Sequence, residues 1–234
     1  MKTNTSAMKL KKLDRIEPIK EKVYTILLEN IVEGRMAPGE QLVEQAVASG
    51  LGVSKSPVRD ALHRLSGDGL VVGAPYKGFS VAPMSVKEFS ELMQVRMAIE
   101  LFCLEQAMGG YSVGDIVEFG ALMDRAGSWL EDSEDNLAHE SHLDFHLLIV
   151  KKYGNEMMMG IYENNRKKLK RYLRVNIRQT PERIRISNQY HLSLLELIQK
   201  RDKAGAIAEL KKHFADITEA FLSGESEARR LFAV

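Results

Sequence analysis

One stretch near the N-terminus decides the fold of that part of the chain: Val53-Ser54-Lys55-Ser56-Pro57-Val58-Arg59-Asp60-Ala61-Leu62-His63-Arg64-Leu65. Ser56 is placed to cap a helix that begins at Pro57, because serine accepts a backbone hydrogen bond and proline fits the first helical turn. The apolar positions recur with helical spacing and form a buried stripe, Val58, Leu62 and Leu65. The opposite face carries Lys55, Arg59 and His63. The stretch therefore predicts a helix with one apolar and one basic face.

The flanking sequence predicts the elements that surround this helix. Apolar residues at helical spacing indicate a first helix over residues 18–33 and a short second helix over about 43–49, followed by a glycine turn. Two β-type runs, 70–72 and 79–81, enclose a glycine-bounded turn and predict a hairpin. Helix, turn, helix and hairpin in this order are typical of a winged helix-turn-helix.

This arrangement favours DNA binding. The exposed N-terminus of the capped helix offers amide groups to phosphate, and Arg59 can reach a guanine edge in the major groove. Residues 1–85 contain 12 Lys and Arg against 9 Asp and Glu, whereas the rest of the chain contains 21 against 23. The alternative is a small helical domain with a solvated basic face.

The N-terminal residues resemble the winged-helix signature of GntR-type bacterial regulators. The matching positions span residues 18–83 and include Pro38-Gly39, Leu51-Gly52-Val53-Ser54, Pro57-Val58-Arg59, Gly69-Leu70-Val71 and Gly78. The resemblance implies that Gln45, Lys55 and Arg59 contact operator DNA and that the wing tip enters the minor groove. Ser56, His63 and the wing residue Lys77 complete the expected contact set. Lys55 stands where arginine is commoner, and lysine lacks the two-pronged donor geometry of arginine.

The C-terminal part reads as helical throughout. Breaks at 109–110, 133–135, 154–155, 180–181 and 201–202 divide residues 85–222 into six helices. The predicted fold is therefore mainly α, a winged helix-turn-helix followed by an antiparallel six-helix bundle. We expect a flexible basic N-terminus (1–17), a DNA-binding domain (18–84), an effector-binding and dimerisation domain (85–223) and a tail (224–234).

Four of the six histidines fall on the inner faces of predicted helices. His142 and His146 are four residues apart and project from one helix face. His191 and His213 lie on the apolar stripes of two later helices. One inward histidine is usually an ordinary core residue, but four on three stripes favour a divalent transition-metal site.

The same residues resemble the FCD effector domain of the FadR-like branch of GntR regulators. The resemblance implies a metal held by residues of an Asp-x-x-Phe-His motif and by two later histidines, with an organic acid bound above it. Here His142 occupies the aspartate position and Tyr190 replaces a common glutamate. A nitrogen-rich ligand set favours zinc or nickel. Arg96, which matches the branch's Arg-x-x-x-Glu, is the expected effector contact, and an intrahelical pair with Glu100 is the alternative.

A run of seven cations between residues 166 and 178 allows two interpretations. It could form a second nucleic-acid surface. It could instead be a solvated helix face with one arginine turned toward an anionic effector. The residues are Arg166, Lys167, Lys168, Lys170, Arg171, Arg174 and Arg178.

Together these features predict a transcriptional regulator, and we expect a repressor. A homodimer would bind palindromic operator DNA and respond to a small carboxylate metabolite. Apolar stripes containing Ala98, Phe102, Met108, Leu122 and Met123 could supply both core and dimer contacts. The alternatives are a constitutive DNA-binding protein with a structural metal, and a zinc hydrolase, for which no His-Glu-x-x-His motif is present. We therefore do not expect an enzyme.

Composition limits where such a protein works. The single cysteine, Cys103, cannot form an internal disulfide. No apolar run approaches the roughly 20 residues of a membrane span, and the first residues lack the apolar core of a signal peptide. We therefore expect a cytoplasmic protein without a membrane partner.

Overall fold

The computed structural model describes residues 18–132, 135–175 and 181–223. The predicted flexible N-terminus (1–17) and tail (224–234) lie outside the described residues. None of the helices in the described ranges has a stretch apolar and long enough to cross a membrane.

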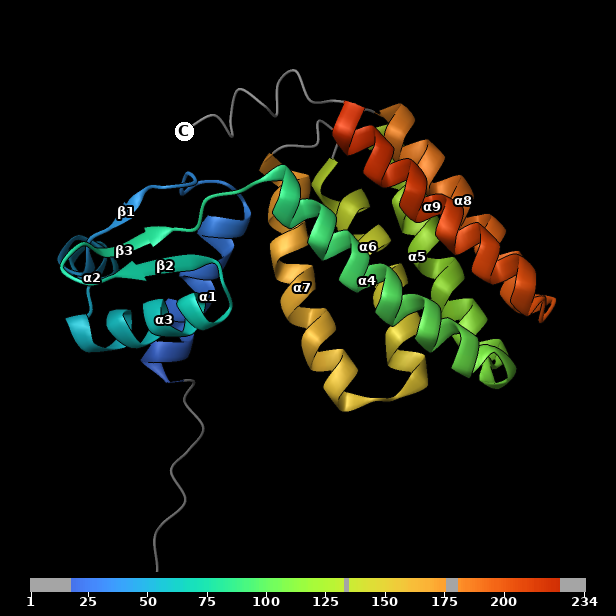
Figure 1. Ribbon diagram of the computed structural model, residues 1–234, viewed down its shortest axis with the longest axis horizontal. Coiled ribbons are helices and arrows are strands. Elements are labelled where there is room, and N and C mark those ends of the chain that lie inside the picture. Colours follow the sequence, from blue (N-terminus) through green and yellow to red (C-terminus); the bar gives the residue numbers. More distant parts are fainter. Residues whose placement is uncertain (1–17, 133–134, 176–180, 224–234) are drawn as a thin grey trace, which may run out of the picture.

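The N-terminal part has three helices and a three-stranded sheet (Figure 1). The elements are α1 (Ile19–Val32), β1 (Gln41–Leu42), α2 (Glu44–Leu51), α3 (Lys55–Gly67), β2 (Val71–Ala74) and β3 (Gly78–Val81). The antiparallel sheet has the order β1-β3-β2, with Leu42 opposite Phe79 and Val71 opposite Val81. The helices and the hairpin were predicted, whereas the two-residue strand β1 was not. These elements enclose a core of their own, to which α1 contributes Leu27 and Ile31, and α3 contributes Val58, Leu62 and Leu65.

The start of α3 differs from the prediction. The helix begins at Lys55 with Ser54 as its N-cap residue, so Ser56 is not the cap. The Ser54 side chain makes no capping hydrogen bond to the described residues. Pro57 is the third helical residue, where its missing N–H costs nothing because the first-turn amides have no intrahelical acceptor. Gly52, at φ 65°, ends α2 in the left-handed conformation and makes the tight turn into α3.

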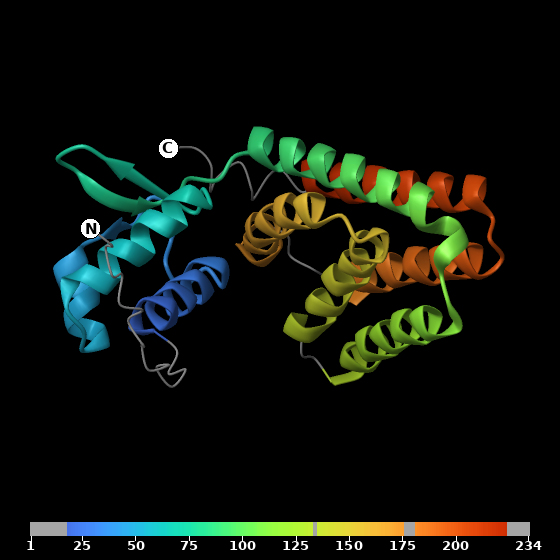
Figure 2. The same ribbon diagram turned by 90° about the horizontal axis from the view of Figure 1, so that it is seen from below.

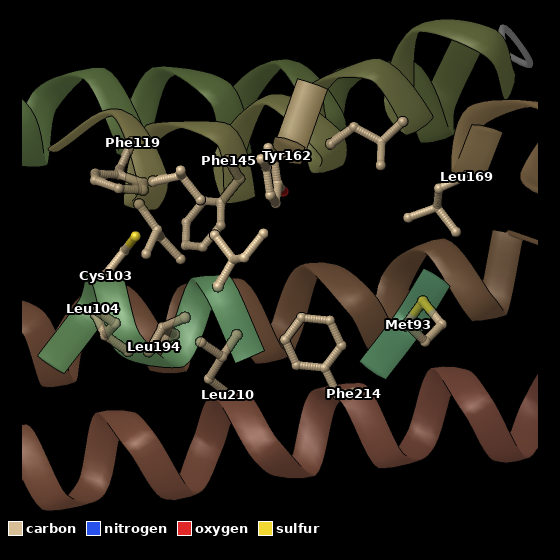
Figure 3. Close-up of a cluster of buried hydrophobic side chains, with 14 of the residues drawn as sticks. Met93, Cys103, Leu104, Phe119, Phe145, Tyr162, Leu169, Leu194, Leu210 and Phe214 are labelled. Atoms are coloured by element: carbon tan, nitrogen blue, oxygen red, sulfur yellow. The ribbon is translucent and has the colours of Figure 1, made fainter. Parts of the chain in front are cut away.

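The C-terminal part is the predicted six-helix bundle (Figures 1 and 2). Its helices are α4 (Val86–Ala107), α5 (Val113–Asp132), α6 (Asp135–Tyr153), α7 (Glu156–Val175), α8 (Pro181–Gln199) and α9 (Lys203–Ser223), with the short 3-10 helix η1 (Met108–Gly110) after α4. The hydroxyl of Ser85 caps α4 by accepting a 3.0 Å hydrogen bond from the amide of Glu88. The bundle encloses a second core, in which Phe145, Tyr162 and Phe214 point into the space between the helices (Figure 3).

Helix α7 is the bundle element that faces the N-terminal part (Figures 1 and 2). Four of its cations, at helical spacing, contact that part, and we call Lys167, Lys170, Arg171 and Arg174 the α7 basic stripe. Lys167 lies 3.2 Å from a carboxylate oxygen of Asp68, the residue that ends α3. Lys170 and Arg174 pair with Glu33, the residue that ends α1. The stripe therefore meets the negative ends of two helix dipoles as well as two carboxylates.

The same helix also fixes the connection between the two parts. The buried Arg171 donates a 2.7 Å hydrogen bond to the carbonyl of Ala82. The hydroxyl of Tyr172 accepts from the amide of Ser85 at 2.8 Å and donates to Glu88 at 2.6 Å. Helix α7 therefore binds the segment between β3 and α4 at both of its ends, Ala82 and Ser85.

These contacts give the basic run a third role that the two sequence interpretations did not include. Arg166 pairs within the bundle with Asp144, and Lys168 lies 3.3 Å from Glu88. Arg178 lies outside the described residues. The α7 basic stripe docks the N-terminal part against the bundle.

We expect Glu33→Gln combined with Asp68→Asn to loosen this docking, because the double variant removes three ion pairs of the α7 basic stripe, each of which contributes about 0.2–1 kcal/mol. In ¹⁵N relaxation measurements, residues 19–82 should tumble with the bundle in the wild type and faster than it in the double variant. Glu182→Gln, which removes an exposed pair with Arg185 within α8, is the matched control and should tumble as one body. Unchanged tumbling of the double variant would contradict the role assigned to these pairs.

Candidate DNA-binding surface and histidine cavity

The basic face of α3 is open to solvent. Lys55, Arg59 and His63 are exposed on the side opposite the buried stripe of α3, and Ser56 is exposed beside them. The Arg59 guanidinium forms a two-pronged pair with Glu44 of α2, with Nε 3.0 Å from Oε1 and Nη2 2.7 Å from Oε2. This pair links α3 to α2.

The remaining predicted contacts surround this face. Gln45 is exposed on α2 and donates a 3.2 Å hydrogen bond to Ser49. The ring of His63 packs edge-on against Phe79 of β3, with 5.0 Å between centroids. Lys77 is exposed in the turn between β2 and β3, at the tip of the wing. Helix and wing therefore present their polar side chains around one exposed region.

Three histidines from three helices meet inside the bundle. The Nε2 atom of His146 on α6 lies 2.9 Å from that of His191 on α8 and 3.1 Å from that of His213 on α9. The Nε2 atoms of His191 and His213 are also 3.1 Å apart. All three side chains are buried, and burial, followed by the neighbouring histidines and Arg96, holds the pKa of His191 and of His213 well below its usual range. We call these residues the histidine triangle.

The triangle has the dimensions that a metal site needs. With sides of 2.9, 3.1 and 3.1 Å, a point about 1.2 Å from its plane is about 2.1 Å from every nitrogen, the usual metal–histidine bond length. Neutral imidazoles are the ligating form, and the low pKa values favour it. The Nδ1 atoms of His191 and His213 have no hydrogen-bond partner among the described residues. The residues present therefore fit a divalent transition metal.

The fourth predicted ligand lies beside the triangle. His142 lines the same cavity, and its ring packs edge-on against that of His191 with 4.8 Å between centroids. Among the described residues, the potential metal-ligand atoms of the three triangle histidines lie within 4.8 Å of one another, and His142 does not belong to this group. Asp144 points elsewhere and pairs with Arg166. A role for His142 as ligand stays a prediction.

Arg96 is buried beside the triangle in the intrahelical pair that the sequence offered as an alternative. Its Nε donates a 2.7 Å hydrogen bond to Oε1 of Glu100, which also accepts from the hydroxyl of Tyr162 at 2.7 Å. Oε2 of Glu100 lies 2.6 Å from Nδ1 of His146. Arg96 also lines the cavity, and its Nη2 atom has no hydrogen-bond partner among the described residues. Pairing with Glu100 and binding an anion are therefore compatible roles.

The histidine triangle lines a cavity together with other polar and apolar side chains. The cavity encloses about 50 Å³. Its polar lining consists of the four buried histidines, Arg96, Arg183 and Ser187, and its apolar lining includes Met93, Leu169, Leu173, Ile217 and Phe221. Leu169 and Leu173 come from α7, on the side away from the α7 basic stripe.

Two known domain families match the chain. Residues 19–81 match the family of bacterial regulatory proteins called gntR, and residues 91–216 match the FCD domain. The chain belongs to the GntR family and carries an FCD domain. It is a DNA-binding transcriptional regulator, and the matched families and relatives are regulators rather than enzymes.

Relatives align with most of this GntR-family regulator, and solved structures share the fold of most of the chain or of its FCD domain. The HTH-type transcriptional repressor RspR of Escherichia coli is 24% identical over 210 residues, which cover 89% of this chain and 91% of RspR. An uncharacterized regulator of Bacillus subtilis, YdhC, is 24% identical over 204 residues, which cover 87% of this chain and 91% of YdhC. The structure of E. coli McbR/YncC superposes with a TM-score of 0.76 at 20% identity, and the match covers 89% of this chain and 99% of that structure's chain. The metal-free FCD domain of TM0439 superposes with a TM-score of 0.52 at 25% identity, covering 61% and 97%.

Two residues of the regulator's site were not anticipated, one that bonds to Glu100 and one in the cavity lining. Tyr162 completes the hydrogen bonds of Glu100, and Arg183 lines the cavity while pairing with Asp216 at 2.8 Å. Neither residue stands in a motif, and both reach the site only through the packing of α7 and α8 against their neighbours. The buried positions of α7 include the polar Asn165 as well as Tyr162 and Leu169, so Tyr162 did not stand out in the sequence.

Proposed function

We propose that this regulator is a repressor that holds operator DNA until a small organic acid binds in the histidine cavity. The main support is that one chain combines an exposed, cationic helix, α3, with a buried triangle of nitrogens suited to bind a metal beside Arg96. The proposal assigns DNA binding to residues 18–84 and effector binding and dimerisation to residues 85–223, in the cytoplasm. RspR, a relative that aligns over most of this chain, is named a repressor.

On DNA, α3 would lie in the major groove and the wing would reach the adjacent minor groove. Arg59 is assigned to a guanine edge, and Lys55 and Lys77 to phosphates or groove edges. Gln45, Ser56 and His63 complete the contact surface. The Glu44 pair is exposed enough that Arg59 can exchange it for DNA at small cost.

In the bundle, His146, His191 and His213 would hold zinc or nickel, with His142 as the fourth ligand. The metal would supply positive charge and would take a carboxylate as a further ligand beside the histidines. Arg96 is assigned to the same carboxylate through its free Nη2 atom. The apolar walls suit a short hydrocarbon body, so the expected effector is a small carboxylic acid rather than a polyhydroxylated one.

Homodimer formation is assigned to α4 and the start of α7. Five apolar residues were expected to supply core or dimer contacts. Met108, Leu122 and Met123 are buried in the bundle, whereas Ala98 and Phe102 are exposed. Exposed Val95 lies on the same face of α4, and Met157 and Ile161 are exposed on the neighbouring α7. An apolar surface of this kind marks an interaction site, and a second copy gives the two recognition helices that a palindrome needs.

Phe102→Glu is expected to convert the dimer into a monomer, because two charges would face each other across a two-fold contact. Light scattering coupled to size-exclusion chromatography reads the mass directly. Val113→Glu, at another exposed apolar position on α5, is the control and should stay dimeric. A dimeric Phe102→Glu variant would place the interface elsewhere.

The decisive experiment for the function is selection of bound sequences from random duplex DNA by the full chain, loaded with zinc. We expect enrichment of a palindromic site, and release from that site when one of a series of short monocarboxylic and dicarboxylic acids is added. Absence of an enriched sequence would contradict operator binding. Binding that no acid changes would instead support a constitutive DNA-binding protein with a structural metal.

A further inference from the structure

Glu100 is a carboxylate with no contact to solvent at the centre of the bundle. Its side chain is 0% exposed, and that of Arg96 on the same helix is 4% exposed. Burying an ionised carboxylate is costly unless hydrogen bonds and a counter-charge compensate for the lost hydration. Three groups do so here, namely Nε of Arg96, the hydroxyl of Tyr162 and Nδ1 of His146.

The two oxygens of Glu100 face different functional groups. Oε1 receives Arg96 and Tyr162, each at 2.7 Å, whereas Oε2 lies 2.6 Å from His146 alone. An ionised carboxylate only accepts hydrogen bonds, so Nδ1 of His146 must carry the proton. Nε2 of the neutral ring then keeps its lone pair, and this is the atom that faces His191 and His213.

His146 differs in this respect from the other two corners of the triangle. The Nδ1 atoms of His191 and His213 have no partner in the described parts of the chain. Glu100 is therefore the protein group that selects a tautomer within the triangle. Outer carboxylates of this kind orient histidine ligands and raise their basicity.

We propose that Glu100 is a positioning residue that joins the metal site to the anion site. It fixes His146 with Nε2 available as a ligand and, through its other oxygen, fixes the guanidinium of Arg96, which lines the cavity and whose Nη2 atom has no hydrogen-bond partner among the described residues. The charges of Arg96 and Glu100 cancel, so the charge that a divalent ion adds is left to attract a carboxylate. The inference rests on the proposed function of the cavity.

A purely structural counter-ion for Arg96 is the competing interpretation. It predicts a loss of stability without any effect on His146 or on metal affinity. Tyr162→Phe separates the two interpretations, because it removes a hydrogen bond to the same carboxylate but leaves the Oε2 contact with His146 intact. Glu100→Gln keeps the size of the side chain and removes its charge and one acceptor.

The experiment uses the full chain and zinc alone as the probe. Nitrogen-15 chemical shifts and couplings of the histidine rings, measured on metal-free wild type, report which nitrogen of His146 carries the proton. Competition with a chromophoric chelator then gives the zinc affinity of wild type, Glu100→Gln and Tyr162→Phe. We expect the proton of His146 on Nδ1, about 10- to 100-fold weaker zinc binding in Glu100→Gln, and a change of less than about threefold in Tyr162→Phe.

The tautomer of His146 and the zinc affinities of the variants test the role of Glu100. A proton on Nε2 of His146 in the wild type would overturn the proposal, and this measurement needs no variant to fold. Equal zinc affinity in wild type and folded Glu100→Gln, or equal losses in both variants, would also overturn it. If wild type binds no zinc, the metal part of the proposed function fails, while the tautomer measurement still decides the role of Glu100.

Discussion

Arg59→Ala is expected to weaken binding to the selected operator about 5- to 150-fold and to relax base preference at one position of each half-site. A two-pronged guanidinium contact with guanine contributes about 1–3 kcal/mol of discrimination, and about 1.4 kcal/mol corresponds to a tenfold change. The guanidinium already presents both donors as a fork in its pair with Glu44. Fluorescence anisotropy with operator and single-base variants measures both effects.

Replacing Lys55, at the start of the same helix, is expected to have a different effect from replacing Arg59. Lys55→Ala should weaken binding to all sequences similarly and reduce the slope of log affinity against log salt by about 1, because an ammonium contacts phosphate as a point charge. Arg185→Ala on α8 removes an exposed arginine far from α3 along the chain and is the control. Equal affinities of Arg59→Ala and Arg185→Ala would show that α3 does not read bases through Arg59.

The N-terminal fold was predictable because its signals are local. The stripe of Val58, Leu62 and Leu65 needs only helical periodicity, and glycines bound the hairpin. The cap was misplaced by two residues because Ser54 and Ser56 are equally good candidates in sequence. The strand β1 was missed because two residues carry no periodicity, and its pairing with β3 depends on the tertiary fold.

The sequence predicted the three histidines that meet in the bundle, but not the geometry of the site or the place of His142. His142 and His146 share a helix face, so spacing alone assigns both to one site. Their separation along that face means that only His146 reaches the point where α8 and α9 bring His191 and His213. Where helices cross depends on packing of the whole bundle, and no local pattern encodes it.

The basic run shows the same limit for charged residues. Sequence supplies the cations of α7, but their partners Glu33 and Asp68 lie roughly a hundred or more residues earlier in the chain. Both acids end helices of the N-terminal part. A charged stripe that looks solvent-exposed or nucleic-acid-binding in sequence is thus a domain contact, and Leu169 and Leu173 on the other side of α7 line the histidine cavity. Helix α7 therefore contacts the cavity on one side and the C-terminal ends of α1 and α3 on the other.

The second large effect concerns metal content. We expect the purified wild type to carry close to one zinc or nickel ion per chain, and the double variant His146→Ala, His191→Ala to carry almost none. Removing two of three converging nitrogens leaves His213 as the last corner of the triangle, and even the loss of an outer-shell partner costs 10- to 100-fold in affinity. Inductively coupled plasma mass spectrometry of protein dialysed against each metal measures the content.

His63→Ala provides the matched control, because it removes an exposed histidine of α3 outside the cavity and should leave the metal content at the wild-type level. His142→Ala then tests the fourth ligand. A wild-type zinc affinity in His142→Ala would mean that the triangle holds the ion by itself, and a fall of tenfold or more would mean that His142 serves as a fourth ligand. Metal-free wild type under metal-replete conditions would contradict the metal centre and leave Arg96, with its free Nη2, as the basis of an acid-binding cavity.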